Sequence, residues 1–447
     1  MIFGLEKEEF SEFTTMYIPM FVEQLMIASI PLFISSTVKD SGMAAVAAVN
    51  LLNSLIGLLQ QAITAFGVGT TVVVSQFRGR GDLNATGRAA AQAVVLAAMI
   101  SCTVAIVCFL ANNLLLSMIF QNSAADVYAY GRIYFNYNLL SLPLIAMYTI
   151  SAAALRGSGF PRVSLIATLI HNLGYAAMAH AAVHWFGMGL NGVGMSLMIS
   201  RGLAGAVGLW FLKRGNANLH IEGFPIKINM DIAKPMFRVS IPLLLEQFIF
   251  SLGRLVTQTF AVPYGTSGMA AAGIANNMHS LQLVPGSSSS NCSLAIVGRY
   301  LGKGDLDGAQ RKGWQFLGLA TALMTISSIT IFLCMKPMAM SSSNDPVVLE
   351  QVYINVMTYC IAIPFLYPSG FVAASILRSS GDGKFTSMVV VAALFLMRIP
   401  LGYFFTHIIK IGIVGIWYGQ IADWLFRTAF FLPRFWSKKW LRNRLLD

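Results

Sequence analysis

The chain has 447 residues, of which 56% are hydrophobic and 11% are charged; its formal net charge is +12 and its mean hydropathy is +0.68. A soluble domain carries roughly 25% charged residues, so this composition excludes an ordinary soluble protein. Apolar runs of roughly 20 to 25 residues recur, each long enough to cross a bilayer core of about 30 Å. Because these runs do not alternate as outer-membrane strands do, we expect an all-α polytopic membrane protein.

The pattern of apolar runs predicts twelve transmembrane helices in two lobes. Their approximate limits are 14–37, 47–73, 88–111, 130–153, 163–186, 190–213, 236–262, 270–298, 312–335, 351–377, 385–408 and 411–434. We expect an N-terminal lobe of six spans (1–213), a cytoplasmic linker (214–235), a C-terminal lobe of six spans (236–434) and a basic cytoplasmic tail (435–447).

Lysine and arginine gather on one side of these spans. Of the 30 basic residues, 22 lie at the N-terminus, in the loops after even-numbered spans or in the tail. The opposite side has only Lys39, Arg132, Lys336 and Lys410. Since cytoplasmic loops carry the excess of basic residues, we expect a multi-pass protein of the cell (inner or plasma) membrane with both termini cytoplasmic. The same distribution explains the net charge without a nucleic-acid partner.

The two halves repeat short motifs in the same order. IPMFVEQ, which begins at Ile18, returns as IPLLLEQ from Ile241, about 223 residues later. SGMAAVAAVN matches SGMAAAGIAN, QFRGRGDL matches RYLGKGDL, and LRGSG matches LRSSG. Because six spans is an even number, both halves enter the membrane in the same orientation, and the pseudo-symmetry axis lies along the membrane normal. Such duplication is typical of transporters.

Only three of the eighteen acidic residues lie inside the predicted spans: Glu23, Glu246 and Asp423. An ionisable residue in a span is costly and marks a functional candidate. Facing a central cleft, Glu23 and Glu246 would form a proton or cation site. Alternatively, each glutamate and its neighbouring glutamine, Gln24 or Gln247, ties its helix to adjacent helices by hydrogen bonds. The sequence leaves both interpretations open.

Other polar residues in the spans have two interpretations as well. Arg254 lies two turns beyond Glu246, where it either pairs with a carboxylate or binds an anionic group of a substrate. Asp423 and Arg427 are spaced i, i+4, which suits a local ion pair. His180 and His184 have the same spacing but no supporting acid or cysteine, and the five cysteines lack metal-binding spacing. We therefore expect no metal and no cofactor.

The repeated motifs resemble those of the multidrug and toxic compound extrusion (MATE) transporters over essentially the whole chain. The resemblance implies two six-helix lobes around a central cavity and alternating access between the two sides of the membrane. It also implies export of amphipathic, often cationic, small molecules, driven by entry of Na⁺ or H⁺. We further expect a monomer that has the lipid bilayer and small-molecule substrates as its partners.

Several acidic positions of the family are missing from this chain. The aspartate that relatives often carry late in the first span falls near Ile34, and the acid one turn after Asn172 is replaced by Ala176. Asn172 itself matches an asparagine of the family's cation site. The glutamate that some members have eight residues after the span-7 proline is Phe250 here. Glu23 and Glu246 therefore remain as the coupling candidates, if the protein is ion-coupled.

The alternatives to a multidrug exporter are less well supported by sequence. A flippase for a lipid-linked precursor, from the same broad superfamily, would need a cavity rich in cationic residues, for which only Arg254 and Arg201 are available. A non-transporting scaffold or receptor does not require a duplicated twelve-span unit with paired acids. No catalytic motif supports an enzyme.

Overall fold

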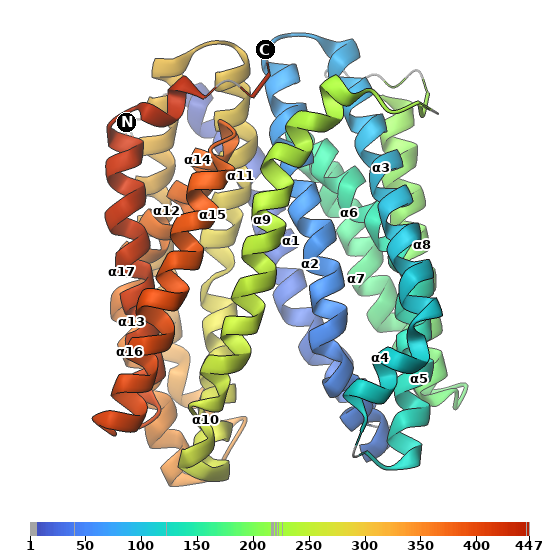
Figure 1. Ribbon diagram of the computed structural model, residues 1–447, viewed down its shortest axis with the longest axis vertical. Coiled ribbons are helices and arrows are strands. Elements are labelled where there is room, and N and C mark those ends of the chain that lie inside the picture. Colours follow the sequence, from blue (N-terminus) through green and yellow to red (C-terminus); the bar gives the residue numbers. More distant parts are fainter. Residues whose placement is uncertain are drawn as a thin grey trace. The chain divides into compact units, whose positions relative to one another are not determined.

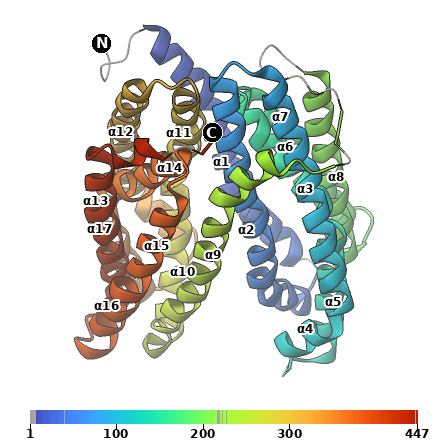
Figure 2. The ribbon, with the colours of Figure 1, turned by 45° about the horizontal axis from the view of Figure 1, so that its top comes forward.

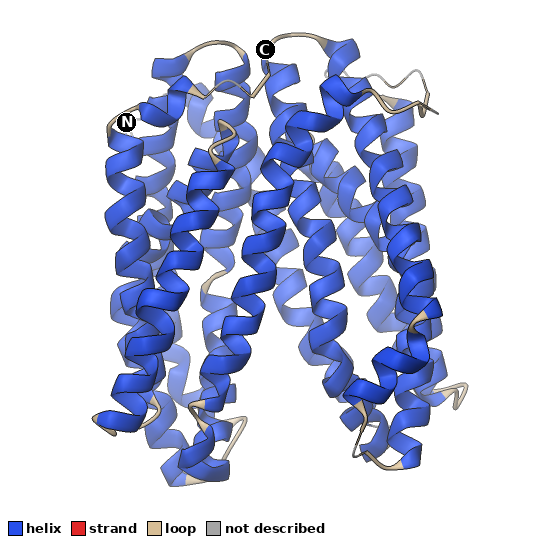
Figure 3. Cartoon of the chain, viewed as in Figure 1, coloured by secondary structure: helices blue, strands red, loops and turns tan. Residues whose placement is uncertain are grey.

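The computed structural model describes residues 7–446, apart from residues 40, 122, 216–218, 220, 222, 226 and 444. Figure 3 draws this part of the chain as helices and connecting loops. All twelve expected spans coincide with helices. By length and apolar composition, seven of the described helices can cross a membrane, or eight when a bent pair counts as one span. The chain is thus an all-α membrane protein, as the composition predicts.

The helices of the first half follow the predicted spans closely. They are α1 (Lys7–Lys39), α2 (Met43–Gly79), α3 (Leu83–Leu110), α4 (Asn112–Ile119), α5 (Ala125–Leu140), α6 (Leu142–Gly157), α7 (Pro161–His184) and α8 (Gly189–Arg214). The fourth span is a pair, α5 and α6, bent by 45°. The short helix α4 was not expected.

The second half has more irregular helices. They are α9 (Met230–Thr259), η1 (Val262–Tyr264), α10 (Gly265–Gln282), α11 (Val284–Gly302), α12 (Leu306–Met340), α13 (Pro346–Tyr367), η2 (Pro368–Val372), α14 (Ala373–Ser379), α15 (Gly383–Ala393), η3 (Leu394–Arg398), α16 (Ile399–Tyr403), η4 (Phe404–Ile408), α17 (Val414–Trp436) and η5 (Lys439–Arg442). The segments η2, η3 and η4 are π-helical turns. Such turns and prolines relax the regular hydrogen-bond ladder, which explains the irregularity.

The repeated glycine–aspartate loops have a structural explanation. Asp82, at the end of RGRGD, caps α3 by accepting a hydrogen bond from the Ala85 amide at 2.8 Å. Asp305, at the end of GKGD, caps α12 by accepting one from the Gly308 amide, also at 2.8 Å. An aspartate cap satisfies amide groups that a helix start leaves free. This motif therefore starts the helix that contains the third predicted span of each half, α3 and α12.

The chain divides into two compact units: one comprises Ile18–Ser240, and the other comprises Met1–Tyr17 with Ile241–Asp447. Both divisions fall immediately before an Ile-Pro pair, within α1 and within α9. The predicted lobes differ from these units in two ways. Residues 1–17 group with the second half, and α9 begins at Met230, inside the predicted linker 214–235.

The start of each of these two helices is anchored in the unit to which it belongs. In α1, the Tyr17 hydroxyl donates to the Pro285 carbonyl at 3.2 Å, and Glu12 pairs with Arg299. In α9, the Phe237 ring lies 5.6 Å from the ring of Phe66 on α2. The remainder of each helix belongs to the other unit, so each helix changes unit at its Ile-Pro pair.

Each unit packs its helices around a hydrophobic core of its own. In the unit Ile18–Ser240, α7 lies along α8, which Figures 1 and 2 both show. Leu52, Leu116, Phe135 and Leu139 are nearly fully buried in its core. In the second unit, Tyr359, Trp417 and Trp424 fill the space between α10, α13 and α17.

The close contact of α2 with the start of α9 gives a test of the packing. A Cβ atom at Gly69 would overlap the Ser240 hydroxyl and lie 2.7 Å from the Met236 carbonyl oxygen. We expect Gly69→Ala to lower the free energy of unfolding by about 1 to 3 kcal/mol, as overpacking does. Thermal unfolding in detergent, followed by size-exclusion chromatography, measures the change.

Gly57→Ala in the same helix is the matched control, because a Cβ atom there meets nothing within 4 Å. Alanine favours a helix over glycine by about 1 kcal/mol, so this variant should be unchanged or slightly more stable. Equal melting temperatures for the Gly69 and Gly57 variants would contradict the packing described.

Candidate functional site

Glu23 lies in a buried ion-pair cluster within the unit Ile18–Ser240. The guanidinium of Arg156 donates from Nη1 to Glu23 Oε1 at 2.6 Å and to Ser164 Oγ at 3.0 Å. Ser164 in turn donates to Glu23 Oε2 at 3.1 Å. Glu23 is only 3% exposed. We call Glu23, Arg156 and Ser164 the Glu23 cluster.

Glu246 lies in an equivalent cluster within the other unit. Arg378 Nη2 donates to both carboxylate oxygens of Glu246, at 2.8 and 2.7 Å, and its Nε donates to Thr386 Oγ1 at 3.2 Å. Ser387 donates to Glu246 Oε2 at 2.8 Å. These four residues form the Glu246 cluster. Each half thus joins its first helix to the arginine of its LRGSG or LRSSG motif.

The local structure explains why these arginines reach the carboxylates. Arg156 lies in the last turn of α6, and Arg378 in the last turn of α14. Positive side chains are stabilised at helix C-termini by the helix dipole. A short loop then leads into α7 or α15, whose first turns supply Ser164, Thr386 and Ser387. A charge-assisted hydrogen bond of this kind is roughly twice as strong as a neutral one.

A third group of charges lies between α9, η3 and α17. Arg427 makes a bidentate pair with Asp423, with donor–acceptor distances of 2.9 and 2.8 Å. Arg398 lies 3.8 Å from Asp423 and donates to Gln420 Oε1 at 3.0 Å. Arg254 follows Phe250 by one turn of α9, and the Phe250 ring lies 5.0 Å from the Arg398 guanidinium and 5.3 Å from that of Arg427. We call Arg254, Arg398, Asp423 and Arg427 the arginine cluster. It confirms the predicted i, i+4 pair and adds Arg398 to it.

Aromatic rings surround the arginine cluster. The Arg398 guanidinium carbon lies 5.0 Å from the centre of the Phe250 ring, and that of Arg427 lies 5.0 Å from the Phe371 ring. Guanidinium groups are attracted to aromatic faces at this distance. His279 of α10 stacks against Trp424 with ring centres 5.8 Å apart. The region therefore combines positive charge with flat apolar surfaces.

The unit Ile18–Ser240 contains a further buried arginine. Arg201 of α8 is 3% exposed and donates to Ser141 Oγ at 2.6 Å and to Asn138 Oδ1 at 3.4 Å. No carboxylate pairs with it among the residues that the structure describes, and its Nε atom lacks a hydrogen-bond partner there. In the described part of this unit, Arg201 is therefore a buried positive charge with polar but no acidic partners.

The other predicted site residues make fewer contacts. Gln24 and Gln247 are half-buried, and Arg254 is exposed. Asn172 is 7% exposed, and its Nδ2 atom has no partner in the described part of the chain. The rings of His180 and His184 lie 4.2 Å apart. Within the described residues, no group of three or more His, Cys, Asp or Glu side chains is placed to hold a metal ion.

Sequence reasoning missed the two arginines that pair with the glutamates. Arg156 and Arg378 were counted among the cytoplasmic loop charges, although both belong to the repeated motif. The missed signal was the parallel repetition of an acid and a base. Glu23 and Arg156 are 133 residues apart in sequence, and Glu246 and Arg378 are 132 apart. Two oppositely charged positions that repeat with nearly the same separation are candidates for an ion pair.

Comparison with known proteins gives a consistent picture. The MatE family model matches residues 19–180 and 242–404. A probable multidrug resistance protein NorM from Thermotoga maritima is 26% identical, over 90% of this chain and 87% of its own length. Human multidrug and toxin extrusion protein 1 is 22% identical, over 95% of this chain and 74% of its own.

Solved structures show the same fold. One is an outward-facing multidrug resistance MATE family transporter, with 18% identity and a TM-score of 0.88; it covers 96% of each chain. Another is a MOP superfamily transporter from Pyrococcus furiosus, with 17% identity, the same TM-score and the same coverage. For that protein, a reverse polarity of the binding pocket suggests a different function.

The Glu23 cluster predicts strong energetic coupling between its two charges. Removing one partner of a buried ion pair costs about 3 to 5 kcal/mol, because the other charge stays buried without compensation. We expect Glu23→Gln and Arg156→Gln each to lower the free energy of unfolding by about 3 to 5 kcal/mol. The double variant should cost clearly less than the sum of both, since neither charge remains. Chemical unfolding in detergent measures all three.

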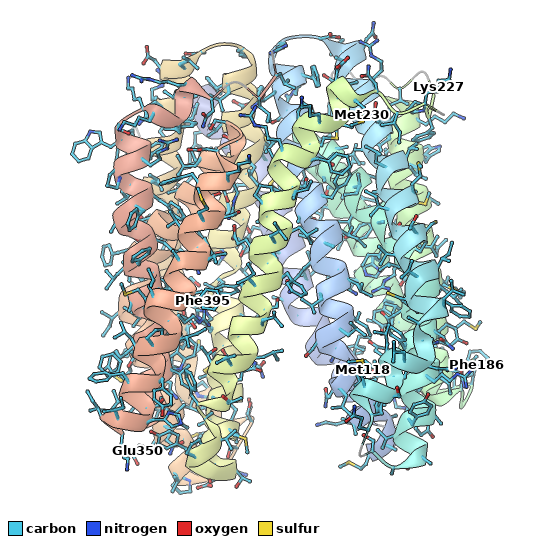
Figure 4. All side chains as sticks on the ribbon, viewed as in Figure 1. Met118, Phe186, Lys227, Met230, Glu350 and Phe395 are labelled. Carbon is cyan, nitrogen blue, oxygen red and sulfur yellow. The ribbon has the colours of Figure 1, made fainter. Side chains whose placement is uncertain are left out.

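The pair of Glu246 and Arg378 should behave in the same way. Glu350→Gln is the control, because Glu350 is exposed at the start of α13 (Figure 4) and should change stability by less than about 0.5 kcal/mol. Strictly additive losses in the Glu23 and Arg156 variants would show that the two charges do not interact.

Proposed function

The chain belongs to the MatE family, whose members are transporters and not enzymes, and on this premise we propose that it exports amphipathic small molecules by alternating access, driven by H⁺ or Na⁺ antiport. The observation that carries the proposal is the repeated ion-pair cluster on α1 and α9. Each cluster lies one to two turns beyond the Ile-Pro pair at which its helix changes unit. A change in the cluster therefore acts on a helix that belongs to both units.

The ion pairs suggest how a cation is coupled to this movement. A proton or Na⁺ that binds the carboxylate of Glu23 competes with Arg156 for the same oxygens. Binding then releases the arginine and weakens the link between α1 and the end of α6. Loss of the cation restores the link. Glu246 and Arg378 allow the same exchange in the other unit, so Glu23 and Glu246 are the coupling groups in this proposal.

The distribution of basic residues supports a membrane location and an orientation for the transporter. With 22 of 30 basic residues on one side, the positive-inside rule favours cytoplasmic termini and a cell-membrane location. Each cluster is complete within one chain, which is consistent with a monomer. The expected preference for cationic cargo stays a prediction from the family resemblance, whereas the excess of guanidinium groups in the arginine cluster favours an anionic cargo.

Transport in proteoliposomes tests the coupling. We expect an imposed inward H⁺ or Na⁺ gradient to drive efflux of an amphipathic dye at least tenfold faster than no gradient does. Glu23→Gln and Glu246→Gln should lose this stimulation and keep passive exchange of dye across the membrane. Glu350→Gln should behave as the wild type. Stimulation is compared only among variants that elute as folded protein.

Two results would count against the proposal. If efflux ignores both gradients, the protein is not a cation antiporter. If stimulation persists in the glutamine variants while their stability falls, the two glutamates hold the helices together and do not couple the ion.

A further inference from the structure

We propose that the arginine cluster binds the acidic head group of an amphipathic organic anion, and that such anions are the cargo; the inference rests on the proposed transport function. The charges inside the spans carry the argument. All three carboxylates there are already neutralised: Glu23 by Arg156, Glu246 by Arg378, and Asp423 by Arg427. A cationic substrate would therefore have to displace an arginine from each of these carboxylates before it could bind there.

Positive charge, in contrast, is in excess. The arginine cluster has three guanidinium groups and one carboxylate, and the carboxylate is held by both Nε and Nη2 of Arg427. Arg398 lies 3.8 Å from Asp423 and donates to Gln420 at 3.0 Å, but its buried Nε atom has no partner in the described part of the chain. A guanidinium within a membrane span that shares its only nearby carboxylate with another arginine is costly, so an incoming anion is stabilised there.

Arg254 provides the accessible member of the cluster. Its side chain is exposed, whereas Arg398 is 8% and Arg427 is 2% exposed. No carboxylate pairs with Arg254 among the residues for which side-chain contacts are described. The helix that carries it is held against η3, because Gly253 packs directly on Leu394 without room for a Cβ atom. A ligand that reaches Arg254 therefore also reaches the field of Arg398.

The chemistry of these groups defines the ligand. A planar guanidinium matches a carboxylate, sulfonate or phosphate, which it can bind through two hydrogen bonds. The neighbouring rings of Phe250 and Phe371 are half-buried and suit an apolar or aromatic body attached to the acid. Arg398 lies ten residues from the end of its helical segment at Ile408, about 15 Å at the helical rise. The cluster thus lies well inside the span.

Two probes of one shape and opposite charge test the inference. Pyrenebutyrate and pyrenebutyl-trimethylammonium share the ring and the chain and differ in the head group. Binding to the detergent-solubilised protein is followed by energy transfer from tryptophan to pyrene, with protein-free micelles as the blank. We expect the wild type to bind the anion at least tenfold more tightly than the cation.

Substitutions then locate the site. Arg254→Gln should weaken binding of the anion about tenfold, the loss of one charge-assisted interaction, and should leave the cation unchanged or bound more tightly. Arg254→Lys should recover part of the affinity by restoring the charge. Arg398→Gln should also weaken binding of the anion, provided that this buried position tolerates the change. Because Arg254 is exposed, its variants test the site even if Arg398→Gln does not fold. Arg132→Gln, at an exposed position on α5, is the control.

Equal affinity for both probes, or tighter binding of the cation, would overturn the inference while leaving export of amphipathic molecules in place. A lipid phosphate is the other source of the same chemistry. If phosphatidylglycerol displaces pyrenebutyrate, and proteoliposomes do not export pyrenebutyrate, the cluster holds a lipid and the claim about cargo is wrong. Export of pyrenebutyrate that falls in Arg254→Gln and recovers in Arg254→Lys would support it.

Discussion

Burial of a carboxylate within an apolar helix requires a compensating charge, and the first helix of each half meets this requirement in the same way. Glu23 and Glu246 are 3% and 5% exposed, and each is paired with an arginine from the end of a distant helix. Such pairs cost free energy to desolvate and rarely add much stability over apolar contacts. They do fix the position of the helix. Moving the helix away would separate the pair and leave each charge buried without compensation, which is strongly unfavourable.

That position matters because α1 and α9 each belong to two units. Both helices change unit immediately before an Ile-Pro pair, and proline removes one backbone hydrogen bond at this point. The start of each helix is held by its own contacts, such as Tyr17 with Pro285 and Phe237 with Phe66. The remainder is held by the ion-pair cluster. Each helix is therefore held on both sides of its Ile-Pro pair, where it lacks a hydrogen bond. This arrangement suits bending of the helix at the proline when the ion-pair cluster changes.

The fold was largely predictable from sequence, because long apolar runs, basic loops and repeated motifs report local and topological properties. All twelve expected spans are helical. The partners of Glu23 and Glu246 were not predicted, since Arg156 and Arg378 lie 133 and 132 residues away in sequence. Their helix-end position resembles a topology signal until the tertiary contact is known. The same holds for Arg398, whose approach to Asp423 depends on how η3 packs against α17.

The net charge inside the spans depends on which charged side chains remain without an oppositely charged partner after these ion pairs form. Counted from sequence, and apart from residues near the span ends, the spans contain three acids and four arginines, which suggests a net charge near zero. The structure adds Arg156 and Arg378 to the interior, where they neutralise Glu23 and Glu246. Asp423 is then the remaining span acid of its unit for Arg254, Arg398 and Arg427, and Arg427 holds it through two hydrogen bonds. The two proposals therefore assign different groups to the two ligands: the coupling ion would exchange with an arginine at Glu23 or Glu246, and an anionic cargo would meet the guanidinium groups that exceed the single carboxylate of the arginine cluster.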